Sequence, residues 1–202
     1  MASDHDRLAL RDLLVDRSLF VAPPGEEFVL ASGKKSKVYL DGKLTTCFSM
    51  AMPLVGRVFL EKIREQGWEP QAVGGLTVGA DPIAFSIARE SLDRPPRIDA
   101  FIVRKVSKTH GRHKFIEGIE DPKGVKIVII DDVCTEGGST GQAIETAKEA
   151  GMQIVGVICL LDRKQGAEEL LRNKFGYQLH SIFTLPELLA YKQERTLEAV
   201  GA

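Results

Sequence analysis

An apolar run followed by two carboxylates and a glycine-rich stretch, between Val125 and Ala143, constrains the fold more than any other part of the chain. It reads VKIVIIDDVCTEGGSTGQA. The β-branched residues from Val125 to Ile130 are typical of a strand that is buried on both faces of a parallel sheet. The residues after the glycines have the spacing of a helix whose apolar face includes Ala143. A buried strand that leads through a short loop into a helix indicates an α/β protein.

Asp131 and Asp132 lie where this strand is expected to end, and a folding core has no use for two adjacent carboxylates. The loop after them can turn backbone N–H groups and hydroxyls inward at the positive end of a helix dipole, as a cradle for a phosphate monoester. The carboxylates would accept hydrogen bonds from sugar hydroxyls or help to hold a metal. The combination therefore indicates a phosphorylated sugar. The small and hydroxyl-bearing loop residues are Thr135, Gly137, Gly138, Ser139, Thr140 and Gly141.

A glycine-rich turn between a strand and a helix can also bind nothing, because such turns are common in α/β proteins. The adjacent pair of Asp residues favours a functional interpretation. No GxxxxGK[ST] sequence occurs in the chain, and the glycine spacing here does not fit GxGxxG. Nucleoside triphosphate and dinucleotide sites of the usual kinds are therefore disfavoured.

Strand and helix patterns alternate from residue 71 onward and predict a doubly wound, mainly parallel sheet. We expect a first strand that begins at residue 72 and further strands at 98–103, 125–130, 154–161 and 179–183. We expect a first helix that ends near residue 91 and further helices at 138–150, 165–174 and 185–193. We predict a single domain, 1–202, with an α/β core, 46–202, and a small hood, 1–45. The hood is expected to hold a helix, 4–18, and a hairpin of strands 28–30 and 37–40, and a second helix, 51–66, opens the core.

In such sheets ligands bind beyond the carboxyl ends of the strands. That rule selects the loops 74–80, 104–118, 131–141 and 162–166. Loop 104–114 reads RKVSKTHGRHK and holds five Lys or Arg and two His without an acidic residue. It is a solvated basic loop, a nucleic-acid-binding segment, or a mobile lid that neutralises a polyanion such as pyrophosphate. Its position after a strand end favours the lid.

Composition narrows the partners and the compartment. The formal net charge of −1 argues against a general nucleic-acid or membrane-surface partner. The three cysteines share no metal-ligand spacing, and two of them stand in apolar contexts that suit buried free thiols in a reducing cytosol. The start of the chain is too acidic and polar for a signal peptide. We predict a cytoplasmic protein.

The stretch from Val125 to Ala143 resembles the 5-phosphoribosyl 1-pyrophosphate (PRPP) motif of the type I phosphoribosyltransferases, which specifies the sugar and not the base. A second match concerns the base, because the basic loop resembles the RK-x-x-K-x-HG loop of the orotate phosphoribosyltransferases. The matching residues are Arg104, Lys105, Lys108, His110 and Gly111. In that family the loop of one subunit closes over the active site of its neighbour. The resemblance therefore implies a homodimer with shared sites.

Two further segments resemble that family. Arg163, in Leu161-Asp162-Arg163, resembles the strand-end Arg that pairs with orotate, and a planar guanidinium suits the carboxylate and carbonyls of that base. The amino-terminal SGxxSxxYxD turn, which lies over the base, is matched by Ser32, Gly33, Ser36, Tyr39 and Asp41. Three departures stand out: Ala31 and Val78 occupy positions where some members have Lys, and Glu136 places an acid within the phosphate cradle.

The resemblance implies transfer of a phosphoribosyl group from PRPP to orotate, giving orotidine 5′-monophosphate and pyrophosphate in pyrimidine biosynthesis. Mg²⁺ is the implied cofactor, held mainly through the substrates, with Asp131 and Asp132 as candidate ligands. The implied catalytic residues are Arg104, Lys105, Lys108 and His110, which also bind PRPP. The other implied PRPP-binding residues are Asp131, Asp132, Val133, Cys134, Thr135, Glu136, Gly137, Gly138 and Ser139. The implied orotate-binding residues are Ser32, Gly33, Thr135 and Arg163. A phosphoribosyltransferase for another base and a PRPP-sensing regulator on the same fold remain alternatives.

Overall fold

The structure is a computed structural model that describes residues 4–29, 33, 35–105 and 115–201. The helices are α1 (Asp4–Arg17), α2 (Lys43–Thr46), α3 (Met52–Glu65), α4 (Asp81–Asp93), α5 (Gly138–Glu149), α6 (Ala167–Leu170), the π-helix η1 (Leu171–Phe175) and α7 (Leu185–Gly201). The strands are β1 (Leu19–Val21), β2 (Phe28–Val29), β3 (Lys35–Ser36), β4 (Val38–Leu40), β5 (Ala72–Leu76), β6 (Asp99–Val103), β7 (Ile116–Glu117), β8 (Lys126–Cys134), β9 (Gln153–Asp162) and β10 (Leu179–Thr184).

The core is one sheet in the order β10-β9-β8-β5-β6-β7, in which only β7 runs antiparallel among the described strands. The chain leaves β5 toward β6 on one side and returns to build β8, β9 and β10 on the other. The strand order therefore reverses between β5 and β8. In open α/β sheets this reversal point, beyond the carboxyl ends of the strands, is where ligands bind.

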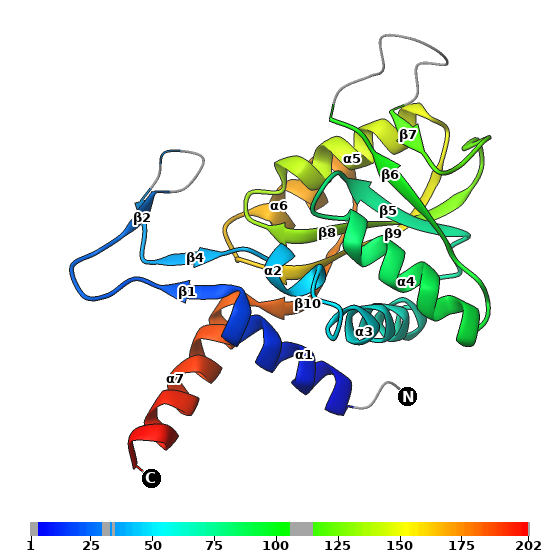
Figure 1. Ribbon diagram of the computed structural model, residues 1–202. Coiled ribbons are helices and arrows are strands. Elements are labelled where there is room, and N and C mark those ends of the chain that lie inside the picture. Colours follow the sequence, from blue (N-terminus) through cyan, green and yellow to red (C-terminus); the bar gives the residue numbers. More distant parts are fainter. Residues whose placement is uncertain (1–3, 30–32, 34, 106–114, 202) are drawn as a thin grey trace.

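Helices cover both faces of the sheet, as Figure 1 shows. Side chains of β8 alternate between them because successive side chains of a strand point to opposite faces. Ile127 and Ile129 pack in the cluster that includes residues of α5, whereas Val128 and Ile130 pack in the cluster that includes residues of α1, α3, α4 and α7. This confirms the predicted doubly wound fold, whose central strand is buried on both faces.

The predicted end of the central strand is wrong. β8 continues to Cys134, because its partner β9 continues with it and pairs Val133 with Leu161 and Cys134 with Asp162. Asp131 and Asp132 therefore lie within a strand and not in the loop after it. Two other elements also differ: α7 continues to Gly201, well beyond its predicted end, and the short edge strand β7 was not predicted.

The hood contains the predicted helix and a hairpin, but its strands pair differently from the prediction. β2 pairs with β3, and β4 pairs instead with β1, a strand that the sequence did not indicate. The Ser36 hydroxyl lies at the bend between β3 and β4, where it donates to the Val38 carbonyl at 2.7 Å and accepts from the Val38 N–H at 3.1 Å. Such a local bond competes with ladder pairing and separates the two strands.

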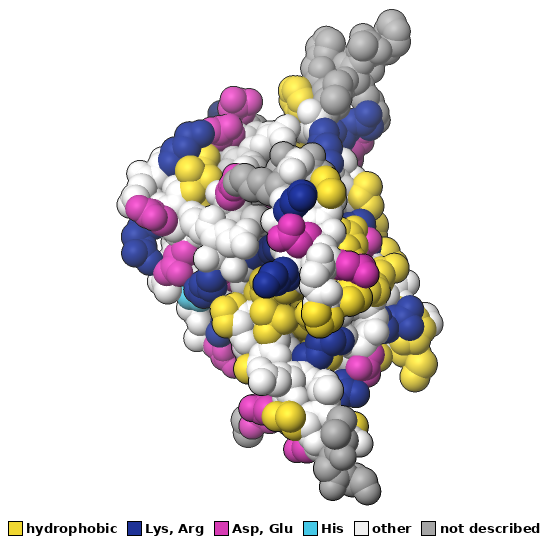
Figure 2. Space-filling model, turned by 90° about the vertical axis from the view of Figure 1, so that its left-hand side faces the viewer, with side chains coloured by type: hydrophobic (Ala, Val, Ile, Leu, Met, Phe, Trp, Pro, Cys, Tyr) yellow, Lys and Arg dark blue, Asp and Glu magenta, His cyan; other side chains and the backbone are white. Residues whose placement is uncertain are grey.

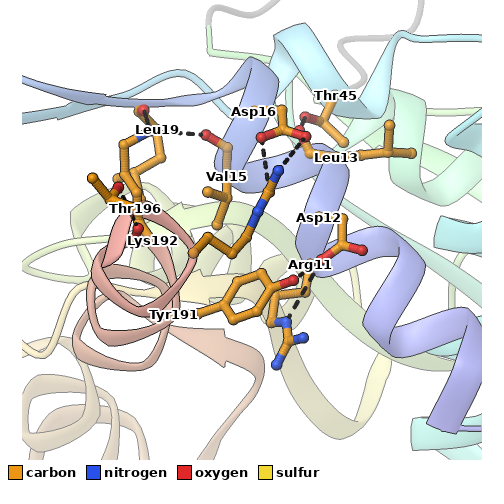
Figure 3. Close-up of polar contacts among 11 residues, drawn as sticks. Arg11, Asp12, Leu13, Val15, Asp16, Leu19, Thr45, Tyr191, Lys192 and Thr196 are labelled. Carbon is orange, nitrogen blue, oxygen red and sulfur yellow. Dashed lines mark hydrogen bonds and ion pairs between the residues drawn. The ribbon is translucent and has the colours of Figure 1, made fainter. Parts of the chain in front are cut away.

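The last helix is fastened to the first, as Figure 3 shows. The Tyr191 hydroxyl donates to Asp12 at 2.6 Å, and the Arg11 guanidinium lies 3.4 Å from the centre of the Tyr191 ring. Arg195 pairs with Asp16 at 2.8 Å. These contacts join segments about 180 residues apart and hold the hood helix against the end of the chain. In the described part of the chain, no helix is long and apolar enough to cross a membrane.

Candidate active site

Asp131 is a buried carboxylate, with 4% of its surface exposed, at the point where β8 reaches the reversal of strand order. It accepts hydrogen bonds from Thr140 Oγ1 at 2.6 Å and Ser139 Oγ at 2.9 Å, both on the first turn of α5. Burial, and after it the charge of Asp132, raise the pKa of Asp131 to about 6. The carboxylate therefore braces the start of α5 against the sheet.

Asp132 is more accessible and faces the neighbouring loop between β5 and α4. A Cβ atom at Gly79 would overlap the Asp132 carboxylate, so only glycine allows the two segments to approach this closely. The same loop contains a cis peptide bond between Thr77 and Val78, and the Val78 side chain is exposed. The reversal point thus places the Asp132 carboxylate against the backbone of Gly79.

Lys43 is a site residue that the sequence analysis missed. Its ammonium lies 2.8 Å from Asp41 Oδ1 and 3.9 Å from Asp132 Oδ2. The hydrogen bond to Asp41 raises the pKa of Lys43. The predicted hood motif ends at Asp41, two residues earlier, but no spacing rule indicates that α2 carries the next cation back to the acidic pair. Lys43 therefore connects the hood to the carboxylates of the core.

The predicted phosphate loop begins at the end of β8 and closes on α5. Gly137, at φ 84°, is the N-cap of α5, and no described side chain caps this helix end by a hydrogen bond. A Cβ at Gly138 would meet only open space. The first N–H groups of α5 thus face a place where an anion fits at the positive end of the dipole.

The other predicted residues of this segment take different positions. Cys134 is buried, with its thiol 3.2 Å from Thr140 Oγ1, and Val133 and Thr135 are half-buried. Glu136 is exposed and lines a surface hollow of about 400 Å³ together with Gly166 and other residues of the α6 region. The other residues that line this hollow lie between Gln165 and Lys174 and not on α5.

Arg163 follows β9 and lies beside the phosphate loop. Its backbone N–H donates to the Cys134 carbonyl at 2.9 Å. Its Nε is buried and has no hydrogen-bond partner among the described residues. A buried donor without a partner costs free energy, which an anionic ligand would recover. The predicted base-binding Arg is therefore held next to the predicted sugar site.

The predicted lid is described only at its base. Arg104 continues β6, with its guanidinium 3.2 Å from Glu117 Oε1 on β7, and Lys105 is exposed. Lys108, His110 and Gly111 lie outside the described residues, as do Ala31 and Ser32 in the hood. Gly33 is exposed with φ 78°. The structure thus brings together the acidic pair, the phosphate loop and Arg163, and it leaves the lid and the Ser32 contact as predictions.

A resident metal centre does not fit the described residues. They contain no group of three or more His, Cys, Asp or Glu side chains that could hold a metal ion. The acidic pair offers hard carboxylate oxygens, which suit Mg²⁺. This donor set fits an ion that is bound mainly by a substrate and only in part by the protein.

Comparisons with known proteins indicate the family of this chain. Residues 50–187 match the model of the phosphoribosyl transferase domain. The chain is 40% identical over 184 residues to the orotate phosphoribosyltransferase of Aquifex aeolicus, which covers 91% of this chain and 98% of that protein.

Two solved structures of the Mycobacterium tuberculosis H37Rv orotate phosphoribosyltransferase are similar. The complex with Fe(III) dicitrate has a TM-score of 0.76 at 34% identity, and the complex with PRPP a TM-score of 0.73 at 32% identity. Each comparison covers 91% of this chain and 98% of the other. Because the similarity spans nearly the whole length of both chains, this chain belongs to the orotate phosphoribosyltransferase family.

Proposed function

We propose that this orotate phosphoribosyltransferase binds its substrates along the carboxyl edge of the sheet, with the sugar over β8 and the base beside Arg163. The reaction transfers the 5-phosphoribosyl group of PRPP to orotate and forms orotidine 5′-monophosphate and pyrophosphate. The observation that carries the proposal is the acidic pair at the reversal of strand order, followed by a helix end that no described side chain caps. This arrangement suits a ribose and its 5′-phosphate.

The 5′-phosphate is assigned to the segment from Thr135 to Ser139. A phosphate there accepts hydrogen bonds from backbone N–H groups and faces the positive end of the α5 dipole. Asp132 is the more accessible acid and is assigned to the ribose hydroxyls together with Asp131. Asp131 has a second task, because its bonds to Ser139 and Thr140 fix the start of α5. Val133 and Cys134 contribute through their backbone.

Orotate is assigned to Arg163, with Thr135, Ser32 and Gly33 as further contacts. The support is the buried Arg163 Nε, which has no partner in the part of the chain that the structure describes. The carboxylate and ring carbonyl of orotate match the two-pronged donor geometry of a guanidinium. A hydrophobic or amino-substituted base would leave that donor unpaired, at a cost of about 1–3 kcal/mol.

The chemistry follows from charge. Positive charge develops on the ribose and negative charge on the leaving pyrophosphate as the bond at ribose C1 breaks. The ring nitrogen of orotate forms the new bond to C1 and gives up its proton, which the departing pyrophosphate can accept directly or through solvent. No covalent nucleophile is required, and catalysis rests on positioning and charge stabilisation. Lys105, Lys108 and the partner's Arg104 are assigned to grip the pyrophosphate, and His110 to hydrogen-bond or protonate it.

Mg²⁺ is the proposed cofactor, and the acidic pair is the set of protein oxygens that fits it. When bound, the ion neutralises charge on the pyrophosphate. Asp131 and Asp132 would hold it in part, and substrate oxygens would supply the remaining ligands.

A homodimer with a lid that acts in trans is the proposed assembly. Figure 2 shows hydrophobic side chains gathered across the middle of the face that carries the hood. Exposed apolar side chains of the hood and its surroundings include Phe20, Val21, Tyr39, Leu44 and Met50. A contiguous apolar surface of this kind is typical of a protein interface.

Mixing two inactive variants tests the trans lid. One variant carries Arg104→Ala and the other Asp131→Asn with Asp132→Asn. In a mixed dimer, the subunit with the intact acidic pair receives the intact Arg104 of its partner, and activity is expected to return. Arg104→Ala mixed with the triple variant Arg104→Ala, Asp131→Asn and Asp132→Asn is the control, which cannot recover because neither subunit supplies Arg104. Lack of recovery at a measured mixed-dimer concentration excludes sharing in trans.

The cytoplasm is the proposed compartment, supported by the free thiols of Cys47, Cys134 and Cys159.

A base-selection assay tests the function itself. The protein is mixed with Mg²⁺ and PRPP and then with orotate, uracil or a purine base in turn, and product formation is followed by absorbance. We expect turnover of orotate alone. Turnover of another base without orotate identifies a phosphoribosyltransferase for that base, and PRPP binding without turnover of any base identifies a regulator on the same fold.

A further inference from the structure

Asp162, directly before the proposed orotate-binding Arg163, is a buried carboxylate to which the family match assigns no task. It is the last residue of β9, and only 2% of its surface is exposed. Both of its oxygens are used by one neighbour. Asp162 Oδ1 accepts the Lys164 backbone N–H at 2.7 Å, and Asp162 Oδ2 lies 3.0 Å from the Lys164 ammonium. A buried charge needs such partners, because burial without them is costly.

Lys164 has an unusual backbone. Its φ of 56° lies in the left-handed region, and no other described residue except glycine has a positive φ. A residue with a Cβ atom adopts this conformation only where its surroundings hold it there. The two bonds to Asp162 supply that restraint, and a third contact, from the Lys164 ammonium to Glu168 Oε2 at 3.2 Å, extends it to α6.

Arg163 lies inside this closed turn. Its neighbours on both sides are fixed to each other, and its own N–H is fixed to the phosphate loop through the Cys134 carbonyl. The backbone of Arg163 therefore has little freedom, and its buried Nε stays unpaired among the described residues. A side chain that must meet a planar anion gains affinity when its position is set in advance.

We infer that Asp162 and Lys164 form a clamp that positions the Arg163 guanidinium for orotate, so that Lys164 determines the affinity for the base without touching it. The inference rests on the proposed role of Arg163. The competing explanation is that the ion pairs only fasten α6. Glu168 also pairs with Arg172 at 2.6 Å, and Arg172 makes no described contact with Asp162.

Three variants separate the explanations, and steady-state KM for orotate, KM for PRPP and kcat are measured for each. Lys164→Met keeps the length of the side chain but removes its charge, and we expect it to raise the KM for orotate about tenfold while the KM for PRPP changes less than about twofold. Lys164→Gly adopts the left-handed turn freely and keeps the N–H bond to Asp162. We therefore expect its KM for orotate to lie between that of Lys164→Met and that of the wild type. Arg172→Met is the matched control, which loses an ion pair to Glu168 but leaves the clamp intact, and its KM values stay at those of the wild type.

Thermal melting shows that each variant is folded. Lys164 is 46% exposed at its side chain, so its replacement leaves the core intact. Any one of three results overturns the clamp. The orotate KM of Lys164→Met stays within twofold of the wild type, both of its KM values rise equally, or Arg172→Met has the same effect. Arg163→Ala separates this failure from a failure of the proposed function. If Arg163→Ala leaves the orotate KM unchanged, the orotate site itself is misassigned, whereas a large effect there with none at Lys164 refutes the clamp alone.

Discussion

Replacing Asp131 by Asn is expected to stabilise this enzyme at neutral pH while it damages the site. Burial and the charge of Asp132 raise the pKa of Asp131 from an ordinary value of 3.8 to about 6. Each pKa unit corresponds to about 1.4 kcal/mol, so keeping Asp131 ionised at pH 7.5 costs the folded state about 3 kcal/mol. Asn is uncharged and close in shape, and it can bond Ser139, Thr140 and the Asp132 N–H in its place. We expect Asp131→Asn to raise the free energy of unfolding by about 3 kcal/mol at pH 7.5.

The sign of the pH dependence follows from the same shift. The pKa is higher in the folded state, so the folded protein binds more protons than the unfolded chain between about pH 4 and pH 6. The stability that protonated Asp131 contributes is therefore present at low pH and is lost as pH rises through about 6. The gain from Asp131→Asn should shrink from about 3 kcal/mol at pH 7.5 to about 1 kcal/mol at pH 4.5.

Urea unfolding of both proteins at a series of pH values measures this difference, because groups that titrate alike in the two proteins cancel. Gln142→Asn, at an exposed position of α5, serves as the control and should show no trend with pH because it removes no titratable group. A gain from Asp131→Asn that is independent of pH, or a loss of stability at pH 7.5, would refute the reasoning. Activity gives the second readout, and kcat/KM for PRPP is expected to fall at least tenfold because a neutral amide is a weaker acceptor for the ribose hydroxyls than a carboxylate.

Other changes probe the rest of the structure. Lys43→Met removes the cation 3.9 Å from Asp132, and we expect it to raise the KM for PRPP several-fold, whereas Lys43→Arg should keep this KM near that of the wild type. An unchanged KM in Lys43→Met would count against the assignment of Lys43 to the site. Gly79→Ala places a methyl group on the Asp132 carboxylate and should reduce kcat/KM for PRPP by about tenfold or more, with only a modest change in melting temperature. Unaltered kinetics would show that the two segments move apart freely. Tyr191→Phe removes the 2.6 Å bond to Asp12 but keeps the ring, so the free energy of unfolding in urea should fall by about 1 kcal/mol while activity is retained. A loss of activity would show that the contact between α1 and α7 is needed for turnover.

The sequence by itself determined the class of fold and predicted the sugar half of the site, because both depend on local patterns. A β-branched run such as the one from Val125 to Ile130 is buried on both faces wherever it lies in a parallel sheet, and the alternation of strands and helices then fixes a doubly wound order. The acidic pair and the loop after it are contiguous in the chain, so their neighbourhood required no knowledge of tertiary structure. The extent of β8 was missed because the length of a strand depends on its partner β9.

Tertiary structure decided the surroundings of the two carboxylates and of the Arg that we propose binds the base. Asp131 and Asp132 look equivalent in the sequence, yet one is buried beneath α5 with a raised pKa and the other faces Lys43 and Gly79 across the reversal of strand order. Lys43 reaches the site only because Gly42, the residue before it, lies against Asp132 and Val133 of β8. Lys164 is held in a left-handed turn only because Asp162 is buried beside it. Burial and charge depend on which segments meet in space, and a local pattern carries no information about segments that are distant in the chain. The sequence therefore indicated which groups to consider for the chemistry, and the packing of separate segments around them set their burial and orientation.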